Sequence, residues 1–236
     1  MTIDLRTEIE RIRTAYQKRR LDDARYTWSD PAYVFMLQNV ERRVLRMLAR
    51  QHLLPLSGKR ILEVGCGTGH WLREFVKWGA DPTAVAGVDL LPDRVTVARS
   101  LCPGGTRVFP CDAQELPFST GEFDMVAHFT VFTSILDSDM KRRVAQESVR
   151  VLKPGGLVLW YDFHVANPRN PDVRPVGHRE LSDLFPGCCI SLERVTLAPP
   201  LVRLVAPRSW VACAILDTIP LLRTHYLAAV RKTGVF

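Results

Sequence analysis

Apolar residues within the first 60 positions recur at helical spacing, which predicts two helices ahead of any strand. Residues 2–20 form the first, a cationic helix with a partly apolar stripe. The second begins where Ser29 or Asp30 can cap it and Pro31 suits its first position, and its apolar repeat continues to about residue 52. We therefore expect a helical extension over residues 1–58.

From Lys59 the pattern alternates between short apolar runs and amphipathic segments, as a parallel sheet with helical crossovers requires. The predicted strands are residues 60–64, 84–89, 106–110, 123–129 and 157–163. The predicted helices between them are residues 69–78, 93–101 and 138–152, with a short helix or loop near 113–118. The fold class is therefore α/β.

The pattern changes after residue 163. Proline-rich residues 167–175 predict an irregular loop, followed by a short helix near 178–185 and a strand over 190–197. Apolar residues 210–216 then precede a last strand over 225–232. Because no internal repeat or linker interrupts the chain, we expect a single domain over 1–236.

A glycine turn after the first predicted strand is the clearest chemical signal. Residues 63–69 have the pattern E-x-G-x-G-x-G, with Gly65, Gly67 and Gly69 in alternate positions. Glycine admits positive φ and lets a ligand approach the backbone, and free N–H groups at the next helix start attract polar groups. The turn predicts a nucleotide-like cofactor. A dehydrogenase is disfavoured, because His70 stands where the dinucleotide fingerprint G-x-G-x-x-G has its third glycine.

Four further motifs follow the glycine turn. Asp89 ends an apolar strand 24 positions after Gly65, and residues 111–118 have the sequence CDAQELPF. FDMV with HF then covers residues 123–129, and RVLKPGGL covers residues 150–157. In order and spacing, these motifs and the turn resemble the class I S-adenosylmethionine-dependent methyltransferases.

The resemblance implies a Rossmann-like three-layer sandwich, with a mostly parallel seven-stranded sheet whose last strand is antiparallel. It also implies S-adenosylmethionine as the cofactor, a lid formed by residues 1–58, a cofactor-binding core over 59–163 and a substrate side over 164–236. The implied cofactor contacts are Glu63, Gly65, Cys66, Gly67, Gly69, Asp89, Leu90, Asp112, Ala113 and His128.

The resemblance also implies roles for several of these contacts. Asp89 is expected to accept hydrogen bonds from the ribose hydroxyls, and Asp112 is expected to reach the adenine amino group. Cys66 contributes mainly its backbone. The Glu63 side chain could instead, or also, hold the glycine turn in place by accepting hydrogen bonds from its backbone N–H groups.

The reaction implied by the resemblance is an in-line displacement, in which a nucleophile of the acceptor attacks the methyl carbon. A hydroxyl acceptor requires a base. The candidates are His164 after the fifth strand, Asp162 on the same strand face, and His128 at the end of the fourth strand. Ordinary packed histidines are the alternative. A notional ion site at Asp137, Asp162, His164 and Asn167 lacks diagnostic spacing, so no metal is expected.

The acceptor is expected to be a small molecule. HFTVF at residues 128–132 departs from the N/D-P-P-Y/F motif of family members that methylate nucleobase or glutamine amines, which favours oxygen or carbon acceptors. Arg169 and Arg174 are candidates to bind an anionic group, with solvent exposure as the alternative. Tyr33 is a candidate aromatic contact to the ligand, with helix packing as its alternative.

Basic residues are concentrated toward the two ends of the chain, which bears on its partners. Residues 1–60 hold 13 basic against 7 acidic residues, 61–162 hold 10 against 13, and 163–236 hold 9 against 5. Basic ends favour an anionic partner or are simply solvated. Methylation of RNA or protein is the second hypothesis, weakened because no RNA-binding module is recognisable. A non-catalytic cofactor-binding protein is a third.

The apolar segment 197–222, flanked by Arg203, Arg208 and Arg223, matches the family least. We expect a substrate cap there, with a homodimer contact and peripheral membrane contact as alternatives. No run reaches the roughly 18 apolar residues of a membrane span, and no signal peptide or C-x-x-C pair is present. The expected protein is a cytoplasmic enzyme that methylates a hydroxyl of a natural product, glycan or lipid-linked compound, with C- or N-methylation as alternatives.

Overall fold

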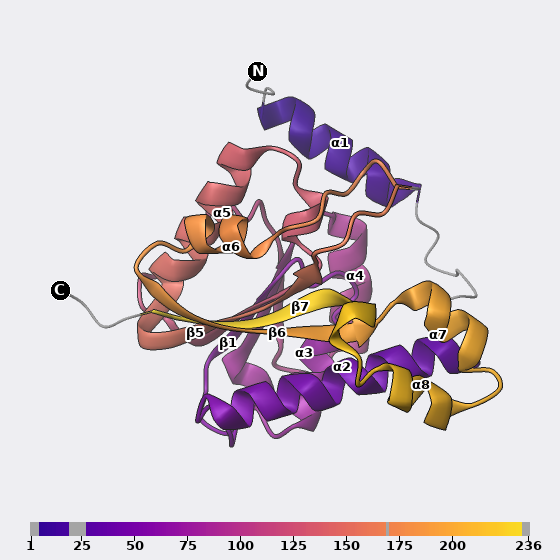
Figure 1. Ribbon diagram of the computed structural model, residues 1–236. Coiled ribbons are helices and arrows are strands. Elements are labelled where there is room, and N and C mark those ends of the chain that lie inside the picture. Colours follow the sequence, from indigo (N-terminus) through magenta and orange to yellow (C-terminus); the bar gives the residue numbers. More distant parts are fainter. Residues whose placement is uncertain (1–4, 19–26, 169, 233–236) are drawn as a thin grey trace.

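The computed structural model describes residues 5–18, 27–168 and 170–232. Seven strands form one sheet in the order β3-β2-β1-β4-β5-β7-β6 (Figure 1). β7 runs antiparallel to its neighbours β5 and β6, and the other six strands are parallel, which confirms the predicted fold class. The strands are β1 (Ile61–Val64), β2 (Val85–Asp89), β3 (Arg107–Pro110), β4 (Phe123–Phe129), β5 (Leu152–Phe163), β6 (Cys188–Leu197) and β7 (Arg223–Lys232).

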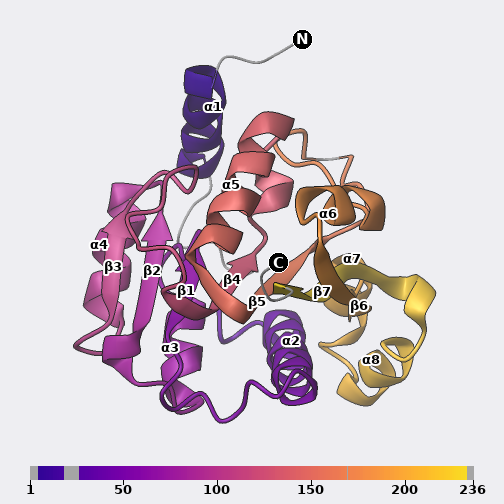
Figure 2. The same cartoon turned by 90° about the vertical axis from the view of Figure 1, so that its left-hand side faces the viewer.

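Helices cover both faces of this sheet (Figure 2). One face is covered by α2 (Pro31–Arg50), α3 (His70–Lys77) and α4 (Pro92–Leu101), the other by α5 (Ser138–Val151) and α6 (His178–Leu184). Strand order reverses between β1 and β4, and ligands of such sheets bind at this switch point, outside the carboxyl ends of the strands. No described helix combines the length and apolar character needed to cross a membrane.

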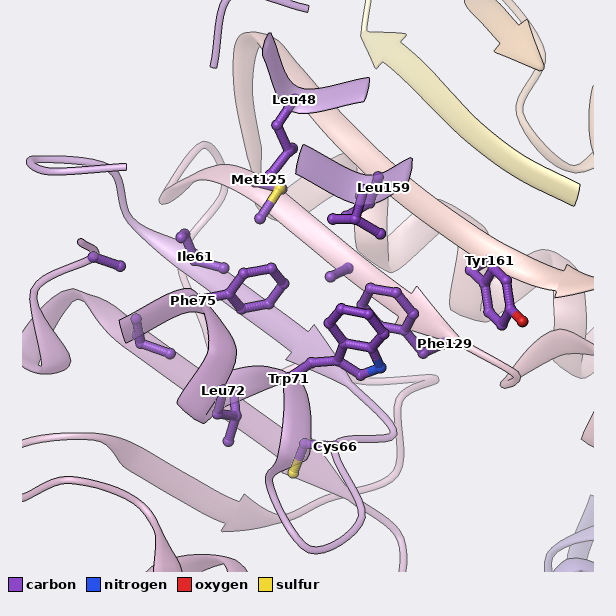
Figure 3. Close-up of a cluster of buried hydrophobic side chains, with 14 of the residues drawn as sticks. Leu48, Ile61, Cys66, Trp71, Leu72, Phe75, Met125, Phe129, Leu159 and Tyr161 are labelled. Atoms are coloured by element: carbon purple, nitrogen blue, oxygen red, sulfur yellow. The ribbon is translucent and has the colours of Figure 1, made fainter. Parts of the chain in front are cut away.

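The core follows the alternation of the strands. Ile61 faces the layer of α2 and α3, whereas Leu62 faces the layer of α5, and both are fully buried. In the first layer, Leu48 of α2 and Phe75 of α3 approach the sheet (Figure 3). Trp71 of α3 stacks on Phe129 at the end of β4, with ring centroids 3.9 Å apart and planes inclined by 8°.

The two N-terminal helices take different places. Asp30 caps α2 by accepting the amide of Ala32, as predicted, and α2 then belongs to one layer of the sandwich. α1 (Leu5–Gln17) instead lies on the loop that follows β4, at the carboxyl edge of the sheet. There Arg11 Nη2 donates to the Ser134 carbonyl at 2.7 Å, and the hydroxyls of Tyr16 and Ser134 are 2.9 Å apart.

The apolar segment between β6 and β7 folds into two short helices, where the sequence pattern indicated only an apolar run. α7 (Pro199–Val205) and α8 (Trp210–Leu216) precede the short 3-10 helix η4 (Pro220–Leu222). We call residues 199–222 the apolar cap. It packs on the start of α2, where Ala32 and Phe35 meet Val202 and Cys213. The buried Asp217 ties it down by accepting from Arg43 at 2.8 Å.

Candidate cofactor and acceptor site

The glycine turn after β1 has the backbone that its sequence predicts. Gly65, Gly67 and Gly69 have φ of +71°, +52° and +77°, a region that favours glycine. A Cβ on Gly65 would lie 2.7 Å from Cγ2 of Val131, and one on Gly69 would lie 2.6 Å from Sγ of Cys102. Conformation and close contact therefore both require glycine at these two positions.

Asp89 connects the end of β2 to this turn. Its carboxylate accepts the amide of Gly67 at 2.7 Å and the amide of Leu91 at 2.9 Å. Burial raises its pKa, while these two N–H groups and the nearby Arg94 act in the opposite direction. One carboxylate thus holds the glycine turn and the start of α4 in register.

Glu63 lies beneath the same turn and is 2 % exposed. Its carboxylate interacts with the amide of Leu72 in the first turn of α3, and its Oε2 has no partner. Burial and the neighbouring Asp89 carboxylate raise the pKa of Glu63 well above its usual range. The Asp89 carboxylate at the turn opposes a pyrophosphate, and the buried, unpartnered Oε2 of Glu63 offers a hydrogen-bonding position to a ligand, so the residues fit S-adenosylmethionine better than a dinucleotide.

The remaining predicted cofactor contacts lie along the same edge or support it. The amide of Cys111 donates to the Asp89 carbonyl at 2.9 Å, which brings the end of β3 beside the end of β2. Asp112 accepts the backbone and side-chain N–H groups of Gln114, and Ala113 and Leu90 are partly buried there. The Cys66 side chain points into the core, where burial raises its pKa, so only its backbone lies in the turn.

Comparison with known proteins agrees with this geometry. The profile of a family described as a methyltransferase domain matches residues 61–156, the segment from β1 into β5. Residues 61–156 are thus similar to a methyltransferase domain, and the matches together support a class I S-adenosylmethionine-dependent methyltransferase. S-adenosylmethionine is the cofactor of this family, as the motifs predicted.

Two curated relatives illustrate the range of the family. The chain is 34 % identical over 128 residues to the ubiquinone/menaquinone biosynthesis C-methyltransferase UbiE of Bordetella avium, covering 52 % of the chain and 48 % of UbiE. It is 31 % identical over 146 residues to the O-methyltransferase cnsE of Penicillium expansum, covering 60 % of the chain and 51 % of that protein. The matches thus span about half the length of these relatives.

A solved structure, the YcgJ protein of Bacillus subtilis, shares the fold with a TM-score of 0.58 at 18 % identity. The alignment covers 82 % of this chain and 100 % of YcgJ. At this identity the likeness concerns the methyltransferase fold alone.

His128 is fully buried between β4 and α5. Its Nε2 lies 2.9 Å from Oγ of Ser148, whose hydroxyl donates to the Val144 carbonyl, so the Nε2 of His128 is the donor in this pair. Burial lowers the pKa of His128 to about 3. This enclosed position does not suit the His128 side chain as a base, and its role as a cofactor contact stays a prediction.

Asp162 and His164 share a face of β5 but do not form the expected pair. Both carboxylate oxygens of Asp162 accept from Thr133, one from its amide at 3.1 Å and the other from its hydroxyl. His164 stacks on Tyr226 with centroids 4.1 Å apart, and its Nε2 is buried without a partner. Asp162 therefore anchors the short helix η3 (Phe132–Ser134), and His164 keeps a free ring nitrogen.

Two of the predicted acceptor contacts, Arg174 and Tyr33, lie at different helices. Arg174 lies 3.6 Å from Glu180 of α6, and its amide donates to the Thr133 carbonyl. Tyr33 lies at the start of α2, edge-on to Trp28 with ring centroids 6.1 Å apart. Arg169 lies outside the described residues.

The structure adds residues that sequence reasoning missed. Thr130, directly after β4, has a φ of +57°, rare for a residue with a Cβ, and its amide donates to the Tyr161 carbonyl at 2.7 Å. Val131 then covers Gly65. Arg94 lies over the Tyr16 ring, 5.0 Å from its centroid, and links α4 to α1 above the turn. The unusual φ had no glycine to signal it in the sequence.

Within the described residues, one group of side chains has metal-ligand character. Single ligand atoms of Glu41, His70 and Glu74 lie within 4.8 Å of one another, between α2 and α3. Nζ of Lys77 is 2.8 Å from Glu74 and 4.0 Å from Glu41, so an ammonium supplies the positive charge there. Asp137, part of the notional ion site, caps α5 instead by accepting the amide of Met140.

Proposed function

We propose that this chain transfers a methyl group from S-adenosylmethionine to a hydroxyl of an apolar small molecule. The free Nε2 of His164, at the carboxyl end of β5, is the observation that carries the choice of a hydroxyl. This ring nitrogen is buried without a hydrogen-bond partner on the sheet edge that also bears the glycine turn, so an acceptor hydroxyl would reach it by entering beside the Tyr226 ring.

The cofactor supplies an activated methyl group, and the chain's own residues hold and orient it. Gly65, Gly67 and Gly69 would let the cofactor approach the backbone, Glu63 would offer its free Oε2, and Asp89 would accept from the ribose hydroxyls. Asp112 and Ala113 form the adenine end of this site. Catalysis then depends chiefly on positioning and on removal of the acceptor's proton.

His164 has properties that suit a base. Burial and the positive charge of Arg194 lower its pKa below 6.5, so the ring is neutral near pH 7 and can accept a proton. Stacking on Tyr226 fixes the ring, and the His164 amide donates to the Thr224 carbonyl at 3.0 Å. We assign Asp162 a positioning role through Thr133, because it does not contact His164.

The names of relatives support an apolar acceptor. UbiE acts in quinone biosynthesis, and a relative in Mycobacterium leprae is a phthiotriol/phenolphthiotriol dimycocerosates methyltransferase. Methylation at carbon is the second candidate, favoured by the name of UbiE as a C-methyltransferase. Deprotonating a ring hydroxyl makes the neighbouring carbon nucleophilic, so His164 would serve either outcome.

Transfer of a labelled methyl group to a panel of phenols, quinols, aliphatic alcohols and amines tests the proposal. Nuclear magnetic resonance of the product distinguishes an O-methyl from a C-methyl group. We expect His164→Asn to lower kcat by about 10²-fold or more, the range for general base catalysis. His178→Asn on α6 is the control, since that histidine is exposed.

The pH profile gives an independent readout. Activity should fall on the acid side with a midpoint below pH 6.5, as His164 becomes protonated, and this limb should be absent from the residual activity of His164→Asn. Full turnover by His164→Asn would remove the base assignment. Transfer to amines alone would refute the hydroxyl proposal.

A further inference from the structure

Exposed apolar side chains concentrate in the apolar cap. Of the ten large hydrophobic side chains exposed among the described residues, six belong to residues 199–222. Leu204, Val211, Ile215 and Leu221 are 63 %, 71 %, 62 % and 85 % exposed. These side chains do not contribute to the core, since the cap uses Val202 and Cys213 for that purpose. The cap thus has one apolar side packed on α2 and another facing solvent.

The charges of the apolar cap have one sign at its surface. Its single acidic residue, Asp217, is buried and accepts from Arg43 and Asn39 of α2. Its basic residues are Arg203, partly buried, and Arg208, exposed. The solvent-facing surface therefore combines apolar side chains with positive charge and lacks any exposed carboxylate within residues 199–222.

A groove beside the cap extends these properties. It has a volume of about 520 Å³ and lies between the start of α2 and the loop that joins α7 to α8. Trp28, Trp210 and Arg208 are among the residues that line it. Indole rings beside arginine are typical of the boundary between hydrocarbon and lipid headgroups, because the ring is apolar and its N–H is polar.

A second groove continues the positive surface along α2. Arg43, Arg46 and Arg50 line it together with Glu193 of β6. Arg43 is paired with Asp217 of the cap and Arg50 with Glu193, so the exposed Arg46 supplies the net positive charge of this groove. Figures 1 and 2 both show α8 beside α2, so these residues and the cap lie on neighbouring parts of one surface. Such a surface is complementary to an anionic headgroup layer.

We propose that the apolar cap docks this protein onto the surface of an anionic phospholipid bilayer. Leu204, Val211, Ile215 and Leu221 enter the boundary of the acyl region, and Arg208 and the exposed Arg46 of α2 meet the headgroups. The cap follows the carboxyl end of β6, which is the sheet edge that bears the glycine turn. Docking would therefore place the acceptor side of the sheet near the membrane.

Flotation of the full chain with vesicles tests this inference. Phosphatidylcholine vesicles with phosphatidylglycerol should carry the protein upward, and phosphatidylcholine alone should do so weakly. Binding should weaken as salt is raised, because exposed charges are screened. The triple variant Val211→Ser, Ile215→Ser, Leu221→Ser should bind roughly tenfold or more weakly, since three apolar side chains no longer leave water.

The matched control is Leu101→Ser on α4, which alters a side chain 53 % exposed outside the cap. It should float like the unaltered protein. Because all of the replaced side chains are exposed, the variants should keep their circular dichroism and their affinity for S-adenosylhomocysteine. If the triple variant loses these properties, the single variant Arg208→Glu replaces it as the test. This variant should lower flotation by reversing one exposed charge.

Two results would overturn the inference. One is absence of flotation with the anionic vesicles. The other is a change from dimer to monomer in the triple variant, seen by light scattering, which would make the cap a contact between copies of the chain. Flotation requires neither an acceptor nor turnover, so this outcome is independent of the proposed methyl transfer.

Discussion

The carboxylate of Asp89 accepts a 2.7 Å hydrogen bond from the amide of Gly67, so the end of β2 holds the turn that follows β1. The same carboxylate accepts the amide of Leu91 at the start of α4. One side chain therefore holds both the glycine turn and the start of α4, the two segments that we propose bind the cofactor. Cofactor binding and local order should depend on it together.

Asp89→Asn should lower the affinity for S-adenosylhomocysteine by about 10- to 100-fold, the range expected for losing a hydrogen bond to a charged group. Calorimetric titration measures it. Asp93→Asn, exposed in the first turn of α4, is the control and should bind normally. Equal affinities for the two variants would refute the role of Asp89.

Comparing Gly65→Ala with Gly58→Ala separates the cost of a crowded Cβ from the cost of a strained backbone. Gly58 has a similar φ of +73° with nothing within 4 Å of an added Cβ, whereas Gly65→Ala would place its Cβ against Val131. Gly58→Ala should cost about 1–2 kcal/mol of unfolding free energy from strain alone. Gly65→Ala should cost more and also impair cofactor binding. Denaturant unfolding gives the comparison, and equal losses would exclude the crowding.

Much of the sheet was predictable because its signals are local. The apolar run before Glu63 and the acidic strand end at Asp89 each mark a boundary in the sequence, and the structure places β1 and β2 accordingly. β5 is different: it begins at Leu152 and runs through Pro154-Gly155-Gly156, ahead of the predicted strand over 157–163. Gly65 and Gly69 were predictable for the same reason, since positive φ restricts residue type.

The rest depends on packing that local pattern does not encode. Nothing near His128 in sequence indicated that Ser148 of α5 would enclose it. The expected pairing of Asp162 with His164 used their shared strand face, but Thr133 from another segment takes both oxygens of Asp162. The apolar cap forms helices that are held by Asp217 and α2, a contact between distant parts of the chain.

Glu8 fixes α1 over the carboxyl edge and should control its order. Its fully buried carboxylate accepts from Arg11 and from the amide of Leu136. Burial acts to raise its pKa, but Arg11 and the amide bonds outweigh burial and lower it. The stabilisation is therefore complete above the unfolded pKa near 4.5 and is lost as pH falls through the folded value.

Glu8→Gln should accordingly release α1 at neutral pH, with a loss of about 1–3 kcal/mol in its protection. Hydrogen exchange of residues 7–17 measures this loss. The control Glu10→Gln changes an exposed neighbour on the same helix and should leave exchange unchanged. Unaltered protection in Glu8→Gln would show that apolar contacts of α1 suffice.

Asp162 should make the stability of the protein depend on pH in the opposite sense. Burial raises its pKa to about 7, although the hydroxyl and amide of Thr133 act to lower it. The folded state therefore holds a proton that the unfolded state releases near pH 4, so this contribution to stability is full below about pH 4 and is lost as pH rises toward 7.

The amide introduced by Asp162→Asn cannot ionise. The free energy of unfolding of this variant, relative to that of the unaltered protein, should therefore rise between pH 4 and pH 8, by on the order of 4 kcal/mol at most. Any cost of replacing an oxygen that faces Thr133 is constant with pH and drops out of the slope. Denaturant unfolding at several pH values gives the two curves. The control Asp183→Asn changes an exposed residue of α6, and its curve of unfolding free energy against pH should run parallel to that of the unaltered protein. A parallel curve for Asp162→Asn would contradict the prediction. It would show that Asp162 is ionised throughout this range, because Thr133 and nearby Lys141 outweigh its burial.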